Sequence, residues 1–293
     1  MRKFILGTDW WTDCDDVVAL RILARAHKNK QIKLEGVIIN ACMEYSASSL
    51  EGFLNCEGVE VPIGLDFDAT DFGGNPPYQN RLKRYSKNIK SNSDVLDATK
   101  LYRKILANAD EKIELIEIGY PQVLVDLLTS KADEFCELDG VELVRKKVSK
   151  ICMMAGKWDE NSGRENNFAR NERSRKAAHT FCEICPVDVT FLGWEVGFDV
   201  ITGQNLKSDD VLHLAMCDHG SANGRSSWDP MLVLLAIIGE CEKAGFSTVC
   251  GKAFVDEQTG ENYFEQNQNG KHKFVVKQKQ NAFYENAINE LIK

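Results

Sequence analysis

The chain has 293 residues, of which 43% are hydrophobic and 27% are charged, and this composition is typical of a soluble globular protein. The formal net charge of -8 argues against nucleic acid as a partner, because phosphate binding needs a basic face. No apolar run approaches the roughly 20 residues that span a bilayer, which argues against a membrane partner. The ten cysteines occur without an export signal, which favours reduced thiols in a cytoplasm.

Apolar runs and helical patterns alternate along most of the chain. Strands are predicted at residues 3–8, 34–39, 62–64, 113–118, 149–154 and 187–192. Helices are predicted at residues 17–26, 47–56, 95–107, 123–128, 141–147, 172–183, 229–244 and 282–292. Periodicity disappears over residues 66–92, and a loop of this length indicates a functional lid or a disordered insert. A short antiparallel hairpin region is expected before the last helix.

Strands that alternate with helices predict an α/β fold with a mostly parallel, Rossmann-like sheet covered on both faces. The sequence has no internal repeat and no linker rich in glycine, proline or serine, so we expect one domain over residues 1–293. Ligands bind such sheets outside the carboxyl ends of the strands. The residues to inspect are therefore those that directly follow a strand, beginning with Asp9 and Asn40.

The stretch GTDWWTDCDD places four aspartates within eight residues, directly after the first predicted strand. Asp15 and Asp16 precede the first helix, so its dipole and free N–H groups offset part of their repulsion. Helix capping alone does not account for Asp9 and Asp13. Hard oxygen ligands without a histidine or cysteine partner point to Ca²⁺ or Mg²⁺, although the spacing is not that of an EF-hand.

A further acid, Asp229, stands at the start of the long apolar helix in NGRSSWDPMLVLLAI. Pro230 follows it at the favoured first helical position, so an N-cap is one interpretation. The alternative is that this helix packs on the sheet and brings Asp229 close to the first-strand loop.

Several segments together resemble the inosine–uridine-preferring nucleoside hydrolases over nearly the whole chain. They are TDWWTDCDDVVAL, LEGVIIN, LYRKILANADEKIELIEIGYPQVLVDLL, GRENNFARNERSRKAA, FLGWEVG, RSSWDPMLVLLAI and NYFEQNQNGKHKFVV. The resemblance implies a Ca²⁺ ion held by Asp9, Asp16, Asp229 and the backbone carbonyl of Gln122. It also implies that Asp9 is the catalytic general base.

The resemblance likewise implies the residues that hold the substrate. They are Asp15 and Asn167 at the ribose, Glu165 near the 5′ end of the sugar, and Asn40 and Trp228 along the pocket. Trp228 stands where several members of the family carry a histidine that protonates the leaving base. Trp11 replaces a glycine of the first motif, so the geometry of this loop must differ.

The sequence leaves the roles of two tryptophans and two loop residues open. Trp10 or Trp11 either stacks on the substrate or packs beneath the loop as core. His219 is a weak candidate for leaving-group activation, and Arg225 is either a substrate contact or an exposed solubilising residue.

The expected activity is Ca²⁺-dependent hydrolysis of the N-ribosidic bond of a ribonucleoside, which releases ribose and free base. The partner is then a small nucleoside or ribosyl substrate, and the resemblance implies a cytoplasmic homo-oligomer in purine or pyrimidine salvage. One alternative is a hydrolase of another ribosyl or glycosyl compound. Another is a catalytically silent Ca²⁺-binding protein of the same fold.

Overall fold

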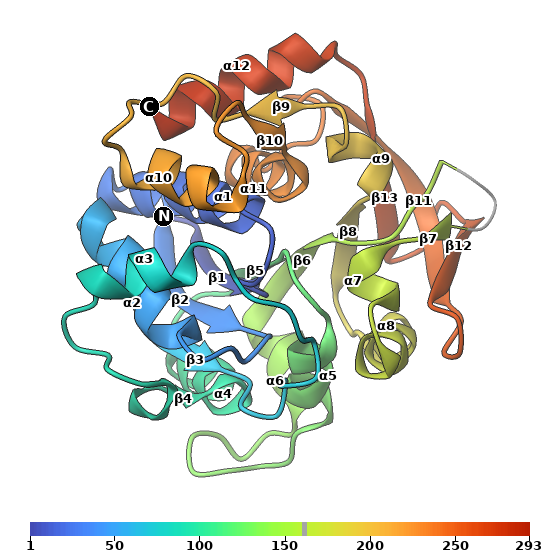
Figure 1. Ribbon diagram of the computed structural model, residues 1–293. Helices are drawn as coiled ribbons and strands as arrows, with labels where there is room; N and C mark the ends of the chain where they lie inside the picture. Colours follow the sequence, from blue (N-terminus) through green and yellow to red (C-terminus); the bar gives the residue numbers. More distant parts are fainter. Residues whose placement is uncertain (160–162) are drawn as a thin grey trace.

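The computed structural model describes residues 1–159 and 163–293. Within these residues, eleven strands form one sheet in the order β4-β3-β2-β1-β5-β6-β8-β13-β11-β12-β7 (Figure 1). The strands are β1 Lys3–Thr8, β2 Lys33–Ile39, β3 Ile63–Leu65, β4 Leu96–Asp97, β5 Ile113–Glu117, β6 Val148–Met154, β7 Gly163–Arg164, β8 Asp188–Leu192, β11 Phe246–Val255, β12 Glu261–Gln266 and β13 His272–Lys277. A separate pair consists of β9 Ile201–Thr202 and β10 Arg225–Ser226.

Helices surround the sheet. The α-helices are α1 Asp15–Lys28, α2 Ser46–Glu57, α3 Gln79–Leu82, α4 Ala98–Asn108, α5 Gln122–Thr129, α6 Gly140–Lys147, α7 Asn166–Ala169, α8 Glu172–Ile184, α9 Trp194–Gly197, α10 Val211–His219, α11 Trp228–Ile238 and α12 Asn281–Ile292. Two short 3₁₀ turns are η1 Lys83–Tyr85 and η2 Asn92–Asp94. In the described part of the chain, every helix is too short or too polar to cross a membrane.

The apolar run of β1 supplies both faces of the sheet, because successive side chains of a strand point in opposite directions. Phe4 and Leu6 pack with α1, α2, α11 and α12 on one face. Ile5 packs with α4, α5, α6 and α8 on the other face. Figure 1 shows these two helical layers above and below the sheet. The expected α/β fold with a mostly parallel, covered sheet is confirmed.

The chain order creates a switch point between β1 and β5. Strands β1 to β4 follow one another outward, and the chain then returns to place β5 on the free side of β1. Both neighbours of β1 run parallel to it. The loops after β1 and β5 therefore diverge from adjacent strand ends, which is where doubly wound sheets bind ligands. A Cβ on Gly119 would lie 2.5 Å from the backbone nitrogen of Asp9, so these two loops touch.

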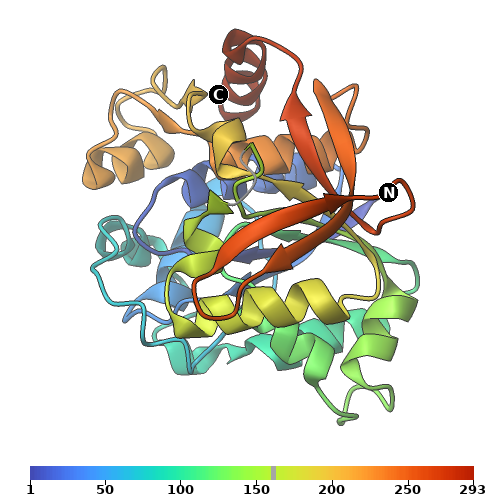
Figure 2. The same cartoon turned by 90° about the vertical axis from the view of Figure 1, so that its right-hand side faces the viewer.

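The C-terminal strands extend the sheet on one side. Strand β13 runs parallel to β8, whereas β11 pairs antiparallel with both β13 and β12. In Figure 2 these strands, in orange and red, face the viewer. The antiparallel addition near the C-terminus is therefore confirmed, and its last strand joins the parallel part of the sheet.

Two expectations about elements are wrong in detail. The helix predicted at residues 229–244 ends at Ile238, because Gly239 adopts a φ of 85° and closes it in a left-handed C-cap. Of the two alternatives for residues 66–92, the disordered insert is wrong: the segment contains α3 and η1, and the side chains of Tyr78 and Leu82 are fully buried. The functional lid stays a prediction. Helices α7, α9 and α10 lie in stretches for which the sequence predicted no element.

Candidate functional site

Acids from the first and last thirds of the sequence meet at the switch point. Asp9 follows β1, Asp15 and Asp16 begin α1, and Asp229 is the second residue of α11. Carboxylate oxygens of Asp15, Asp16 and Asp229 lie within 4.8 Å of one another. The backbone N–H of Asp229 donates to Oδ2 of Asp15 at 3.3 Å. The packing of α1 against α11 brings these distant segments together.

Burial and mutual repulsion make these acids hard to ionise. Desolvation raises the pKa of Asp9 to about 7, and the charges of Asp15 and Asp13 add to this shift. The same causes hold the pKa values of Asp15, Asp16 and Asp229 well above their ordinary range. Among the described residues, none of these four aspartates forms an ion pair with lysine or arginine.

This donor set fits a divalent cation. It consists of buried carboxylate oxygens from two segments, the start of α1 and the start of α11, with no thiol or imidazole among Asp15, Asp16 and Asp229. Hard cations such as Ca²⁺ and Mg²⁺ take oxygen ligands of this type. Buried charges without a partner are strongly unfavourable, so a cation would relieve the repulsion that raises the pKa values.

The loop between Asp9 and Asp16 is held by side chains from inside the fold. The Thr8 hydroxyl donates to Oδ1 of Asp16, and the same hydroxyl oxygen accepts the backbone N–H of Trp10 at 3.1 Å. Trp10 has a φ of 46°, a left-handed conformation that is rare for a bulky residue. Its indole is fully buried and donates to Ser49 at 2.9 Å. Trp10 is therefore a core residue that anchors this loop.

Asp13 forms an ion pair with Arg225 and is not part of the group formed by Asp15, Asp16 and Asp229. Its carboxylate accepts two hydrogen bonds from the Arg225 guanidinium, one of them at 2.9 Å from Nε. Burial raises the pKa of Asp13, but the guanidinium outweighs this effect and the net shift is downward. Nε2 of His219 lies 3.8 Å from the same carboxylate. Arg225 is thus a half-buried partner of Asp13, 212 positions away along the chain.

The opposite side of the site carries the residues expected at the sugar. Glu165 is the N-cap of α7 and accepts the backbone N–H groups of Asn167 at 2.8 Å and Gly156 at 3.0 Å. Burial raises the pKa of Glu165 to about 7. Nδ2 of Asn167 donates to the carbonyl of Met154 at 2.9 Å. Both side chains are therefore fixed before any ligand binds.

These groups surround one cavity of about 200 Å³. The lining residues are Asp9, Asp13, Asp15, Asp16, Ile118, Met154, Glu165, Asn166, Asn167, Trp194, Arg225, Trp228 and Asp229. The structure thus brings together seven of the residues proposed from the sequence: Asp9, Asp15, Asp16, Glu165, Asn167, Trp228 and Asp229.

Asn40 and Gln122 do not line this cavity, contrary to their expected positions. The Asn40 amide donates to Glu117 at 2.8 Å and accepts the backbone N–H of Tyr120 at 3.1 Å. Nε2 of Gln122 donates to the Asn40 carbonyl and to Asp66. Both residues instead support the loops beneath it.

Glu117 is a buried acid that sequence reasoning missed. Its side chain is fully buried at the end of β5, and desolvation raises its pKa to about 8. A Cβ on Gly7 would lie 2.0 Å from Oε2 of Glu117, so this carboxyl group occupies the space that the glycine leaves. The sequence signal that could have revealed this buried acid is a glycine in the first strand, Gly7, which pairs with Glu117 of β5.

A cluster of aromatic rings joins the loops after β1 and β5 to the segment that follows β3. Trp11 donates from its indole to the carbonyl of Gly73 at 2.6 Å, and Phe72 stacks on Tyr120 with ring centroids 4.1 Å apart. Arg170 lies over the Trp11 ring at 4.6 Å. Residues 66–76, the lid segment, are therefore pinned against the loops after β1 and β5. In Figure 1 this segment is the cyan trace that passes in front of the sheet on its way to α3.

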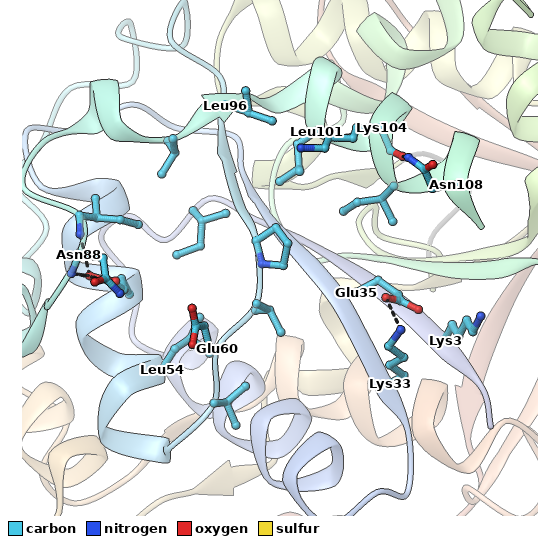
Figure 3. Close-up of a pocket in the computed structure, with 18 of the residues that line it drawn as sticks. Lys3, Lys33, Glu35, Leu54, Glu60, Asn88, Leu96, Leu101, Lys104 and Asn108 are labelled. Carbon is cyan, nitrogen blue, oxygen red and sulfur yellow. Dashed lines mark hydrogen bonds and ion pairs between the residues drawn. The ribbon is translucent and has the colours of Figure 1, made fainter. Parts of the chain in front are cut away.

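A larger hollow of about 770 Å³ lies at the opposite, amino ends of β1 and β2 (Figure 3). Its charged side chains form pairs of their own, such as Lys33 with Glu35 at 3.0 Å and Lys3 with Asp110. The floor is apolar and includes Leu54 and Leu101. In the described part of the chain, the acids of this hollow form no group that could hold a metal ion, whereas those of the smaller cavity do.

Solved structures of other proteins have the same fold as this chain. No protein-family model and no curated protein matches the sequence. Solved structures do match over the whole chain. An inosine-guanosine nucleoside hydrolase and an inosine-uridine preferring nucleoside hydrolase from Bacillus anthracis each have 15% identity and a TM-score of 0.68, with 99% of their own chains covered.

Another match is the type III effector protein XopQ complexed with adenosine diphosphate ribose, at 15% identity, a TM-score of 0.66 and 93% coverage of that chain. Identities of this size show the architecture and leave the reaction to be argued from the site. The chain therefore has the nucleoside hydrolase-like fold over its full length.

Proposed function

We propose that this protein hydrolyses the N-ribosidic bond of a ribonucleoside or related ribosyl compound with the help of Ca²⁺. One observation carries the proposal: Asp9, Asp15, Asp16 and Asp229 converge on the same cavity as Glu165 and Asn167. Carboxylates at one end suit a cation and a sugar diol, and the polar groups at the other suit the remaining hydroxyls. The structural similarity to nucleoside hydrolases supports the same reaction class.

The residues divide the work as follows. Asp16 and Asp229 hold the cation with Asp9 and Asp15 beside it, and Asp15 accepts a hydrogen bond from a ribose hydroxyl. When bound, such an ion supplies positive charge that activates water and orients the diol. Asp9 takes the proton of the attacking water as general base. No second carboxylate acts as a nucleophile in this scheme, so the anomeric centre is inverted.

The acids also favour the transition state. Departure of the base leaves positive charge on the ribosyl ring, and preorganised negative groups stabilise that charge. This is a reason for a chain to keep acids that repel one another in the free protein. Glu165 and Asn167 fix the sugar so that the anomeric carbon faces Asp9.

Ribose release from inosine, uridine, adenosine and p-nitrophenyl riboside, with CaCl₂ or a chelator, tests the proposal. We expect turnover that the chelator abolishes. Asp9→Asn should lose at least about 10³-fold in kcat, since it removes the general base, while it keeps the thermal unfolding of the parent. Asp209→Asn, an exposed acid of the same type, is the matched control and should leave kcat unchanged.

Two results would count against this function. The absence of ribose from every substrate would favour a catalytically silent protein that keeps the fold. Full activity of Asp9→Asn would remove the assigned general base. A cytoplasmic role in nucleoside salvage and assembly into dimers or tetramers remain predictions, which cell fractionation and sedimentation would check.

A further inference from the structure

A row of aromatic rings forms one wall of the acidic cavity. Trp228 begins α11 and Trp194 begins α9, and their ring centroids lie 6.4 Å apart with an interplanar angle of 32°. Phe198 stacks on Trp194 at 4.5 Å and continues the row toward solvent, where it is 51% exposed. The indole N–H of Trp228 donates to the Trp194 carbonyl at 2.7 Å, so the wall is fixed before a ligand arrives.

The polar groups beside this wall are already engaged. The Arg225 guanidinium lies 5.3 Å from the Trp228 ring centroid and donates two hydrogen bonds to Asp13. Nδ1 of His219 pairs with the hydroxyl of Ser221 at 2.8 Å, and this imidazole is not among the residues that line the cavity.

Among the described residues, the wall therefore offers no free imidazole, thiol or phenol to a leaving group. The Glu165 carboxyl group also lines the cavity, but both of its oxygens already accept backbone N–H groups, from Asn167 and Gly156. This matters because a neutral purine or pyrimidine nucleoside releases its base as an anion unless an acid protonates it. A substrate whose glycosidic nitrogen is already cationic needs no such acid, because its base leaves as a neutral molecule.

The charge of the cavity favours the same class of substrate. Six carboxyl groups and one guanidinium line it. Once a bound divalent cation has ionised Asp9, Asp15, Asp16 and Asp229, and Asp13 is paired with Arg225, negative charge remains in excess. A cleft lined by one sign of charge concentrates ligands of the opposite sign. Tryptophan faces add to this, since they attract cations more strongly than other aromatic rings do.

We propose that the preferred substrates are N-ribosylpyridinium compounds and other ribosides with a positive charge at the glycosidic nitrogen. The proposal rests on the hydrolase function inferred above. The bond from the anomeric carbon to the ring nitrogen breaks, and its electron pair stays on that nitrogen and cancels the charge. Water forms the new bond to the anomeric carbon and gives its proton to Asp9. The aromatic wall holds the planar cation until it leaves as a neutral base.

Competing substrates test this inference. We expect kcat/KM for nicotinamide riboside to exceed that for inosine and for uridine by at least about 100-fold. Comparable values for inosine or uridine would overturn it. Cleavage of p-nitrophenyl riboside, a neutral compound with a good leaving group, without cleavage of nicotinamide riboside would overturn the inference and leave the hydrolase function standing. No cleavage of any riboside would overturn both.

A binding experiment provides a readout that does not depend on turnover. 1-Methylnicotinamide and nicotinamide have nearly the same shape but differ in charge. Quenching of tryptophan fluorescence in the Ca²⁺-loaded protein should give a Kd at least about tenfold lower for 1-methylnicotinamide. Equal affinities would overturn the inference.

Replacement of the wall residue completes the test. Trp228→His introduces an imidazole beside the leaving group and should raise kcat/KM for inosine relative to nicotinamide riboside by at least about tenfold. Trp228→Phe is the matched control, since it keeps an aromatic face without an acid and should preserve the preference for the cationic substrate. If Trp228→His still binds Ca²⁺ but has the same ratio of kcat/KM for inosine to kcat/KM for nicotinamide riboside as the parent, the lack of an acid does not set the substrate preference. This result would overturn the inference.

Discussion

The acid cluster predicts how stability depends on pH and on the cation. The perturbation is removal of divalent ions with a chelator, followed by a change of pH from 5 to 8. Without a cation, the folded state holds protons on acids whose pKa values are raised, and the unfolded state does not. The stability that these protons contribute is present below the unfolded pKa and is lost as pH rises through the folded pKa.

The magnitude follows from Asp9, whose pKa rises from 3.8 to about 7 because of burial. Between pH 5 and pH 8 this shift removes about 3 kcal/mol of stability. For a chain of 293 residues, this corresponds to a fall of about 4 °C in Tm. Asp15, Asp16 and Asp229 shift in the same direction and enlarge the effect.

A bound cation keeps the acids ionised, so the effect is measured best as a difference. Burial lowers the pKa of His272 to about 4, and this group gains stability with rising pH whether or not a cation is present. The difference in Tm between CaCl₂ and chelator cancels that contribution. We expect this difference to widen by at least about 4 °C from pH 5 to pH 8.

Two variants test whether the pH dependence of the Tm comes from the buried acid cluster or from charges at the surface. Asp229→Asn should raise the Tm in chelator at pH 8, because it relieves repulsion, and should remove most of the response to CaCl₂. Asp209→Asn removes the same charge at an exposed position and should alter neither the Tm in chelator nor the response of the Tm to CaCl₂. A difference in Tm that stays constant or narrows with rising pH would refute the reasoning.

Three further substitutions test the architecture around the cavity. Gly7→Ala would place a Cβ 2.0 Å from Oε2 of Glu117 and should lower the free energy of unfolding by about 3 kcal/mol, measured by urea denaturation; an unchanged midpoint would contradict this packing. Trp11→Ala should release the lid segment, seen as faster limited proteolysis within residues 66–76, and an unchanged cleavage rate would count against the pinning. Asp13→Asn should raise KM through the loss of the ion pair with Arg225 and leave Ca²⁺ affinity unchanged, whereas weaker Ca²⁺ binding would make Asp13 a ligand.

Much of this site follows from local sequence patterns. Apolar runs locate the strands, and the rule that ligands bind at their carboxyl ends points to Asp9. The proline after Asp229 marks a helix start, which is where that acid lies. These inferences succeed because strand and helix periodicity depend on neighbouring residues.

The groups that the sequence did not reveal depend on contacts between distant segments. Arg225 reads as a surface residue until Asp13 is placed beside it. Trp194 starts a helix of only four residues, which is too short to produce a periodic pattern. Glu117 resembles a polar residue at the end of a strand, and only the packing of β5 against Gly7 shows that it is buried.

The conformation of one residue explains why four acids and two tryptophans occur together. The left-handed φ of Trp10 lets its indole enter the core while the next residue, Trp11, turns toward the lid segment. The same loop pairs Asp13 with Arg225, and Asp13 lines the cavity together with Asp9, Asp15 and Asp16. One short stretch thus supplies the acids proposed as cation ligands, the buried anchor Trp10, the contact of Trp11 with residues 66–76 and the partner of Arg225. The stretch reaches the aromatic wall only through Arg225, which donates to Asp13 and lies 5.3 Å from the Trp228 ring centroid, so a substitution of Asp13 should act on the leaving-group side of the cavity.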